Sequence, residues 1–185
     1  DSIVEFVKYV NQKNFNLSSQ VTSLFETNQF LIDQKPTLIE YAAFFGSIQI
    51  FDFLQLNNVA LNPCLWEYAI HSNNPDLIHR LERLSIDRLY KNHDDTLYEE
   101  AIKCNNNEIA KYIQNEQIFN EAKVLVANAF ESFNIEMIKY LIETRFEIES
   151  INIYKNLIEH DFANIVCILV KEGRLDYKTN LEISL

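Results

Sequence analysis

The side chains best suited to chemistry in this chain are a few histidines and carboxylates. His71, the pair His93 and Asp94, and Asp161 follow one another in an order that could hold one or two metal ions and activate water for phosphate-ester hydrolysis. The pair lies in a polar stretch, residues 91–95, directly before an expected helix, where acidic side chains stabilise unpaired backbone N–H groups. His71 and Asp161 belong to segments far apart along the chain. We therefore expect capping and surface roles for these residues, with no metal site and no catalytic residue.

Cysteines and glycines offer no stronger signal for chemistry. Cys64, Cys104 and Cys167 are odd in number and widely spaced, which favours reduced thiols in an intracellular, cytoplasmic protein over a disulfide framework. Cys167 falls in the apolar run 165–170, so we expect it in the core. The sequence has no Cys-x-x-Cys or His-Glu-x-x-His motif, and its two glycines cannot form a phosphate-binding loop. We expect no bound cofactor.

The amino-acid composition limits both the fold classes and the kinds of partner that we expect. A chain of 185 residues with 48% hydrophobic content suits one compact domain or a short repeat array. With only 2 Gly and 3 Pro, a turn-rich β-sandwich is not expected. The net charge of −11 repels nucleic-acid phosphates and anionic lipid, and no apolar run approaches the roughly 18 residues of a membrane span. We expect a soluble helical protein that binds no nucleic acid and does not insert into a membrane. Since the first residue is not Met, we also expect the sequence to be a piece of a longer chain.

An apolar template recurs five times along the sequence. Each instance has a small or apolar anchor residue, an aliphatic residue eight positions later, and Leu or Ile twelve positions later. The five sets are Ala42, Ile50 and Leu54; Ala69, Leu77 and Leu81; Ala101, Ile109 and Ile113; Ala129, Met137 and Leu141; and Leu157, Ile165 and Leu169. Successive anchors are 27, 32, 28 and 28 residues apart. This period accommodates two short helices and their connections.

A polar break separates the anchor from the following aliphatic residue in every instance. The breaks are Gly46 and Ser47; Asn73, Asn74 and Pro75; Asn105, Asn106 and Asn107; Phe133 and Asn134; and His160 and Asp161. Asn and Gly tolerate the left-handed conformation that ends a helix, and Pro can begin the next one. Helix-start signals are Thr37 with Glu40, Thr96 with Glu99, and Asn62 before Pro63. Each unit is therefore predicted to be a helix, a tight turn and a second helix.

A helical hairpin of this length cannot bury its apolar face alone, so neighbouring hairpins must stack into a continuous core. We therefore predict an all-α fold, an α-solenoid of stacked helix-turn-helix repeats that forms a single domain over residues 1–185. The predicted units are an N-terminal helix pair at 1–35, from apolar runs 3–10 and 21–31, repeats at about 36–62, 63–93, 94–118, 119–148 and 149–174, and the start of a further or capping unit at 175–185. Trp66 is expected to be partly buried between repeats.

The segment 37–54 resembles the helix-turn-helix half of an ankyrin repeat, whose pattern runs T-P-L-H-x-A-A, two variable residues, Gly, an aliphatic pair and Leu-Leu. More closely, residues 38–81 with 101–114 resemble the divergent ankyrin-like domain of large protozoan families. Leu38 and Glu40 replace the Pro and His of the family pattern, Gly46 is the only Gly at its position, and the period is shorter than the usual length of about 33. The β-hairpin finger is therefore expected to be reduced or absent. The resemblance implies binding of other proteins through a concave face, without a catalytic centre.

The positions one before, and two and three after, each anchor lie on a different face of the first helix from the anchor itself. They include Tyr41, Phe44, Phe45, Tyr68 and His71 in the first two repeats, and Glu100, Lys103 and Glu131 in later ones. Ankyrin-like stacking would place them on the concave surface, where exposed aromatic side chains are typical of interface anchors and acidic ones favour a partner with a basic segment. The alternative interpretations are that the aromatic rings pack between repeats, and that the acidic side chains form a solvated surface that binds no partner.

These observations predict a non-catalytic scaffold that binds a partner protein through the concave face of its repeats. Two alternatives stay open. One is a helical metal-dependent hydrolase of the HD type, named for the order of His and Asp described above, and the other is a structural segment of a larger protein.

Overall fold

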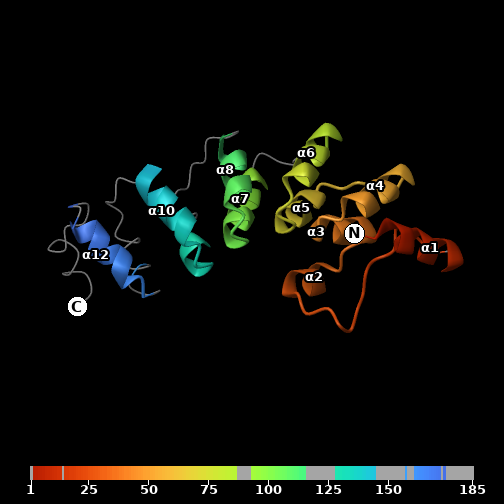
Figure 1. The fold of residues 1–185 in the computed structure, drawn as a ribbon, viewed down its shortest axis with the longest axis horizontal. Coiled ribbons are helices and arrows are strands. Elements are labelled where there is room, and N and C mark those ends of the chain that lie inside the picture. The colour runs from red at the N-terminus through yellow and green to blue at the C-terminus, as the bar shows by residue number, and fades with distance from the viewer. Residues whose placement is uncertain are drawn as a thin grey trace. The chain divides into compact units, whose positions relative to one another are not determined.

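The computed structural model describes residues 2–13, 15–86, 93–115, 128–144, 157, 161–171 and 173 (Figure 1). Its helices are α1 (Ile3–Lys13), α2 (Gln29–Gln34), α3 (Leu38–Phe44), α4 (Ile48–Leu56), α5 (Leu65–His71), α6 (Pro75–Arg83), α7 (His93–Lys103), α8 (Asn107–Asn115), α10 (Ile135–Thr144) and α12 (Ala163–Lys171). The described residues contain no β-strand, and their isolated β-bridge joins Gln20 to Thr37. The predicted all-α class is confirmed. None of these helices combines the length and the apolar composition needed to cross a membrane.

The chain divides into two compact units, Asp1–Leu97 and Tyr98–Leu185. In the first unit, α3 packs against α4 and α5, and α5 packs against α6. Two helical hairpins, α3 with α4 and α5 with α6, are therefore in contact through their first helices. The N-terminal helix α1 packs against α4, where the rings of Phe6 and Phe53 meet edge to face at 5.9 Å.

The turn inside each hairpin has the same backbone conformation in all five template instances. The residue four positions after each anchor has a positive φ between 50° and 61°; these residues are Gly46, Asn73, Asn105, Phe133 and Asp161. In four instances the next residue donates its N–H to the carbonyl of the anchor, at 2.8 to 2.9 Å, as at Ser47 to Ala42 and Asn134 to Ala129. This pattern is the left-handed helix ending called a Schellman motif. The exception is Asn74, whose N–H donates to Ser72 Oγ at 3.1 Å.

The template residues form the core wherever their side chains are described. The anchors are all buried, as are the described residues twelve positions later; Ile50 and Ile165, eight positions after their anchors, are half-buried. The residue that follows the anchor, and the residue that follows the position eight later, are also buried in the first four instances. These neighbours are Ala43, Ile70, Ile102 and Phe130 in the first helices, and Phe51, Ile78, Ala110 and Ile138 in the second. The apolar stripe is therefore two residues wide, and each helix contacts its neighbours over a broad face.

Polar side chains join the two hairpins of the first unit. The Glu40 carboxylate accepts hydrogen bonds from the backbone N–H of Thr37 (2.6 Å) and from its hydroxyl (2.8 Å), which confirms the predicted capping box. It also accepts one from Asn62 Nδ2 at 2.7 Å. Asn62 therefore binds the preceding hairpin and does not cap α5, which begins three residues later. The helices α4 and α6 are joined by an ion pair between Asp52 and Arg80.

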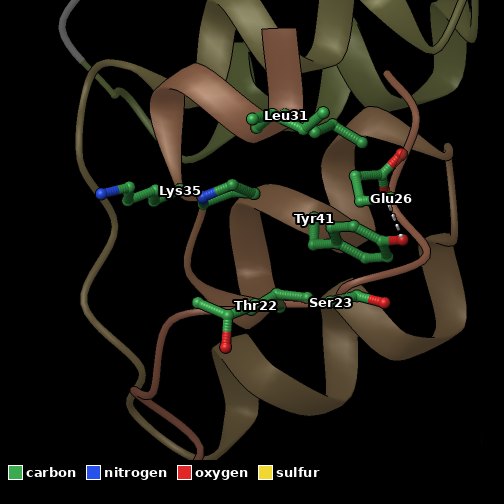
Figure 2. A pocket seen from close by; sticks show the side chains of 9 residues that line it. Thr22, Ser23, Glu26, Leu31, Lys35 and Tyr41 are labelled. Atoms are coloured by element: carbon green, nitrogen blue, oxygen red, sulfur yellow. Dashed lines mark hydrogen bonds between the residues drawn. The ribbon is translucent and has the colours of Figure 1, made fainter. Parts of the chain in front are cut away.

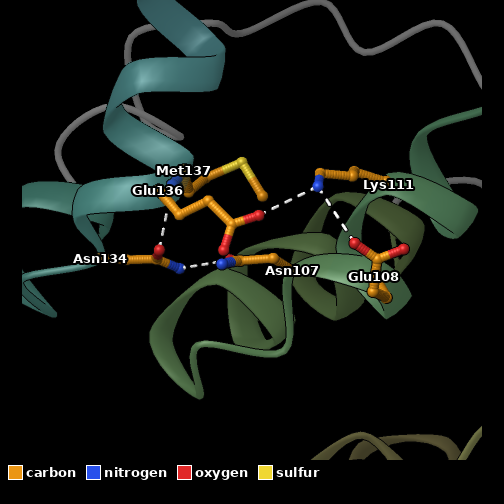
Figure 3. Close-up of polar contacts among 6 residues, drawn as sticks. All are labelled: Asn107, Glu108, Lys111, Asn134, Glu136 and Met137. Carbon is orange, nitrogen blue, oxygen red and sulfur yellow. Dashed lines mark hydrogen bonds and ion pairs between the residues drawn. The ribbon is translucent and has the colours of Figure 1, made fainter.

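In the second unit, Asn134 is the main polar link between consecutive hairpins (Figure 3). Its Oδ1 accepts a hydrogen bond from the N–H of Met137 at 3.0 Å and so caps α10. Its Nδ2 donates to the carbonyl of Ile102 at 2.9 Å and to Asn107 Oδ1 at 2.8 Å, both in the preceding hairpin. Asn74 has the equivalent place in the first unit, where it caps α6 and donates to the Gly46 carbonyl at 3.5 Å.

A second, more exposed polar link lies beside Asn134 (Figure 3). The ammonium group of Lys111 is 3.1 Å from a carboxylate oxygen of Glu108 in the same helix and 3.1 Å from one of Glu136 in α10. It also lies 5.8 Å from the centre of the Tyr140 ring. These hydrogen bonds raise the pKa of Lys111, and its ammonium lowers the pKa of Glu136. Because exposed ion pairs are weak, the buried Asn134 contributes more to the link.

The predicted N-terminal helix pair is only half correct. Helix α1 forms over Ile3–Lys13, but residues 21–28 are not helical and α2 begins only at Gln29. Local side-chain bonds stabilise a turn there instead: Ser23 Oγ accepts from the N–H of Phe25 at 3.1 Å, and Glu26 Oε1 accepts from the N–H groups of Thr27 and Asn28 at 2.9 Å each. Such bonds compete with helix formation. The periodic apolar residues of this run do not form one helical face.

Three smaller expectations are corrected. Helix α7 begins at His93, so Thr96 lies inside the helix and does not start it. Cys167 is exposed on α12 and not part of the core. Asn62 is not the cap of α5, as described above.

Two other expectations, the burial of a Trp ring and the start of a helix at Pro, agree with the structure. Trp66 is buried, and its indole Nε1 donates to the carbonyl of Ile86 at 3.2 Å. Pro75 is the first residue of α6, as its position after two Asn residues predicts. The connection 57–64 contains turns and no strand. The predicted unit at 175–185 lies outside the described residues.

The shared turn conformation gives a stability prediction. Gly46→Ala is expected to lower the free energy of unfolding by about 1 to 2 kcal/mol, because an L-residue at a positive φ is strained. The new Cβ would also lie 3.3 Å from Asn74 Nδ2. Asn73→Gly, at the equivalent position of the next hairpin, is expected to be neutral or stabilising. Thermal unfolding followed by circular dichroism tests both, and a neutral Gly46→Ala would contradict the turn assignment.

Candidate functional site

The aromatic residues predicted for a binding surface lie together on the first unit. We call Tyr41, Phe44, Phe45, Tyr68 and His71, on and just after α3 and on α5, the aromatic face. Ring centres of Tyr41 and Phe45 are 4.9 Å apart, those of Phe44 and Phe45 are 5.1 Å apart, and those of Phe44 and His71 are 5.0 Å apart. The buried side of the same helices carries the anchors, so the repeat pattern itself turns these rings away from the hairpin core.

A residue outside the repeats completes this cluster. Phe30, on α2, places its ring 4.2 Å from that of His71, 5.2 Å from that of Tyr68 and 5.9 Å from that of Phe44, measured between ring centres. It therefore contacts side chains from both hairpins at once. The sequence pattern did not identify Phe30 as a site residue, because it belongs to no repeat. One sequence signal could have indicated it, because Asn28 is a typical helix-capping residue. Its Oδ1 accepts a hydrogen bond from the N–H of Leu31 and caps the short helix that carries Phe30.

The predicted exposure of the aromatic face is partly wrong. Tyr68 is only 4% exposed, and the Phe30 ring packs edge to face against its ring. Burial, with the nearby charge of Glu40 as a smaller cause, raises the pKa of its phenol. Tyr41, Phe44 and His71 are half-buried. Phe45, by contrast, is 56% exposed and is the open member of the aromatic face.

Tyr41 is held by the turn that precedes α2. Its hydroxyl donates to Glu26 Oε2 at 3.0 Å, and Figure 2 shows this bond beside the Leu31 side chain. Burial, and then the Glu26 carboxylate, raise the pKa of Tyr41. The pKa of Glu26 is lowered mainly by the N–H of Asn28, with Tyr41 as a further donor. Tyr41 therefore fixes the turn against α3 while its ring contacts Phe45.

A small pocket lies between this turn, α2 and Tyr41 (Figure 2). Its volume is about 130 Å³, and its lining residues are Val21, Thr22, Ser23, Glu26, Leu31, Ile32, Lys35, Pro36 and Tyr41. Sites for small molecules and cofactors usually enclose about 300 to 1,000 Å³. The pocket has the size for one side chain or a few waters, and its walls are mixed apolar and polar.

Two apolar side chains project from the turn that lines the pocket. Leu24 and Phe25 are both exposed, Phe25 by 92%. The turn is fixed by hydrogen bonds from Phe25 N–H to Ser23 Oγ and from Glu26 N–H to the Ser23 carbonyl. The apolar spacing of residues 21–31 predicted a helix here, so the exposure of Leu24 and Phe25 was not expected.

In the second unit, the predicted acidic surface is partly neutralised. Glu131 is exposed, and Glu100 is half-buried with its carboxylate 4.0 Å from the ammonium group of Lys103. Nearby, burial and the charge of Glu100 raise the pKa of the Cys104 thiol to about 12. A thiol with that pKa stays protonated at neutral pH and is a poor nucleophile. The positions that carry the rings of the aromatic face in the first two hairpins thus carry charged side chains in the third and fourth.

The residues considered for metal-assisted hydrolysis have other roles where they are described. His71 packs its ring against Phe30 and Phe44. Asp161 is exposed and occupies the left-handed position of its helical turn. The side chains of His93 and Asp94 lie outside the described part of the chain. No protein-family model, curated protein or solved structure matches this chain significantly.

Proposed function

We propose that this protein is a non-catalytic scaffold that binds a partner protein through the inner face of ankyrin-like helical hairpins stacked as a solenoid. The observation that carries the proposal is the shared geometry of the hairpins. All five template instances have the left-handed turn residue at the same position, and the described hairpins of each unit are linked by an Asn side chain that follows that residue. Solenoid proteins that bind partners repeat one structural unit and vary its surface residues.

The chemistry of the face supports an interaction role. Aromatic side chains bury a large area with little loss of rotamer freedom, which is why they dominate the energetics of protein interfaces. In the first unit they lie on one side of α3 and α5, and Phe45 stays accessible there. The chain carries a net charge of −11, which favours a partner with a basic segment.

Affinity capture with the whole chain as bait tests this proposal. Phe45→Asp is expected to lower recovery of the partner from a lysate of the source cell at least tenfold, because a charge would be buried in the interface. Leu56→Asp is the matched control, since Leu56 is also exposed (77%) but lies at the end of the second helix α4. Loss of capture with Leu56→Asp and not with Phe45→Asp would contradict the proposed face.

A further inference from the structure

The segment between Val21 and Pro36 forms a closed loop with a fixed base. The N–H of Val21 donates to the carbonyl of Pro36 at 2.7 Å, and the N–H of Leu38 donates to the carbonyl of Ser19 at 3.2 Å. Ends held this close are typical of an Ω-loop. These two bonds attach the base of the loop to the start of α3. Lys35, at a φ of 50°, ends α2 next to this base and is the position at which the chain turns.

The other end of the loop rests on the aromatic face through few side chains. Helix α2 has only six residues, of which Leu31 is buried and Phe30 half-buried. Gln29, Ile32, Asp33 and Gln34 are exposed. Outside α2, the Glu26 carboxylate anchors the loop to Tyr41. A helix this short has little stability of its own, so its contacts with Phe44, Tyr68 and His71 hold it in place.

Phe30 occupies the part of the face where a partner is expected to bind. It contacts rings from α3 and α5, at positions one before and two after the anchors of two consecutive hairpins. The same chain therefore supplies both the binding face and the side chain that covers it. The occupant also indicates the chemistry the face accepts, namely a short helical turn with an aromatic residue followed by an aliphatic one.

We propose that α2 is a displaceable internal ligand, and that the partner protein presents an equivalent aromatic and aliphatic pair that replaces Phe30 on the aromatic face and Leu31 in the pocket beside Tyr41. This inference rests on the proposed function and adds a regulatory step to it. The closed loop covers the face, so the apparent affinity for the partner is the intrinsic affinity multiplied by the fraction of molecules in which the face is open. Changes that release the loop strengthen binding without altering the face.

Hydrogen exchange on the intact wild-type chain tests whether the loop opens independently. The amides of Ile32 and Lys35, bonded within α2, are expected to show protection about 100-fold lower than those of Tyr41 and Phe51 in the hairpin helices. Equal protection would mean that α2 opens only when the hairpins unfold, which would overturn the inference. Because no partner is present in this measurement, its failure would leave the proposed scaffold function intact.

A peptide of residues 27–36 tests whether the face accepts such a ligand. Added to the whole chain carrying Phe30→Ala, it is expected to perturb the NMR signals of Phe44 and His71 and to bind at least tenfold more tightly than to the wild type. Phe25→Ala, in the same loop but 92% exposed, is the matched control and should bind the peptide as the wild type does. Equal binding to all three proteins, or binding to none, would overturn the inference. If Phe30→Ala unfolds the first unit, the exchange measurement on the wild type decides.

Discussion

Tyr68→Ala is expected to lower the free energy of unfolding of the first unit by about 3 to 5 kcal/mol, the range for truncating a buried aromatic side chain. Tyr68 is buried and its ring contacts Phe30, and nothing in a packed interior refills the space that its ring leaves. Chemical denaturation followed by circular dichroism measures the loss.

Phe45→Ala provides the comparison within the same aromatic face. Phe45 is 56% exposed and its ring contacts Tyr41 and Phe44, so we expect a loss below about 1 kcal/mol. Similar losses for Tyr68→Ala and Phe45→Ala would contradict the division of the face into a structural part and an accessible part. Loss of partner binding with Tyr68→Ala would not identify an interface, because that variant is destabilised.

The second large effect is expected at Asn134. Asn134→Ala removes the cap of α10 and both hydrogen bonds that Asn134 Nδ2 donates to the preceding hairpin, to the Ile102 carbonyl and to Asn107 Oδ1. Losing a cap costs about 1 kcal/mol, and each of the two lost hydrogen bonds costs about 0.5 to 1.5 kcal/mol. We expect a total loss of about 2 to 4 kcal/mol in denaturant unfolding.

Asn134→Ser separates these two contributions. A Ser side chain can still cap α10 but is too short to donate to Ile102, so the loss should be smaller by about 1 kcal/mol than for Asn134→Ala. Ser47 occupies the corresponding position before α4, where its side chain makes no cap bond, so the position accepts Ser sterically and the variant tests whether Ser can cap α10. Equal losses for the Ser and Ala variants would mean that the cap contributes nothing and that the bond between hairpins carries the whole effect.

The repeated part of the fold could be predicted because its physical requirements recur. Each hairpin needs an anchor, a left-handed turn residue four positions later and two buried aliphatic residues beyond it, and these spacings are visible in the sequence. The identity of the turn residue was harder to recognise. Gly46 and Asn73 are typical of a positive φ, whereas Phe133 is not, and it adopts this conformation because the packed helices on both sides determine the backbone there.

The non-repeated part could not be predicted by the same means. The apolar spacing of residues 21–31 fits a helix, but Ser23 and Glu26 hold the backbone in a turn through bonds that a periodicity argument does not include. The burial of Tyr68 followed from a tertiary contact with Phe30, which lies 38 positions earlier in the chain. The sequence therefore indicated which rings share a face, but not that the chain covers part of that face itself.

Direct contact between the aromatic face and a partner is the central claim, and site-specific photo-crosslinking measures it. The residue p-benzoylphenylalanine replaces Phe45 in one protein and Leu56 in another, and each is irradiated in a lysate of the source cell. We predict a discrete covalent adduct from position 45 and none from position 56. An adduct of equal yield from position 56, or none from position 45 while affinity capture of the partner persists, would contradict the account.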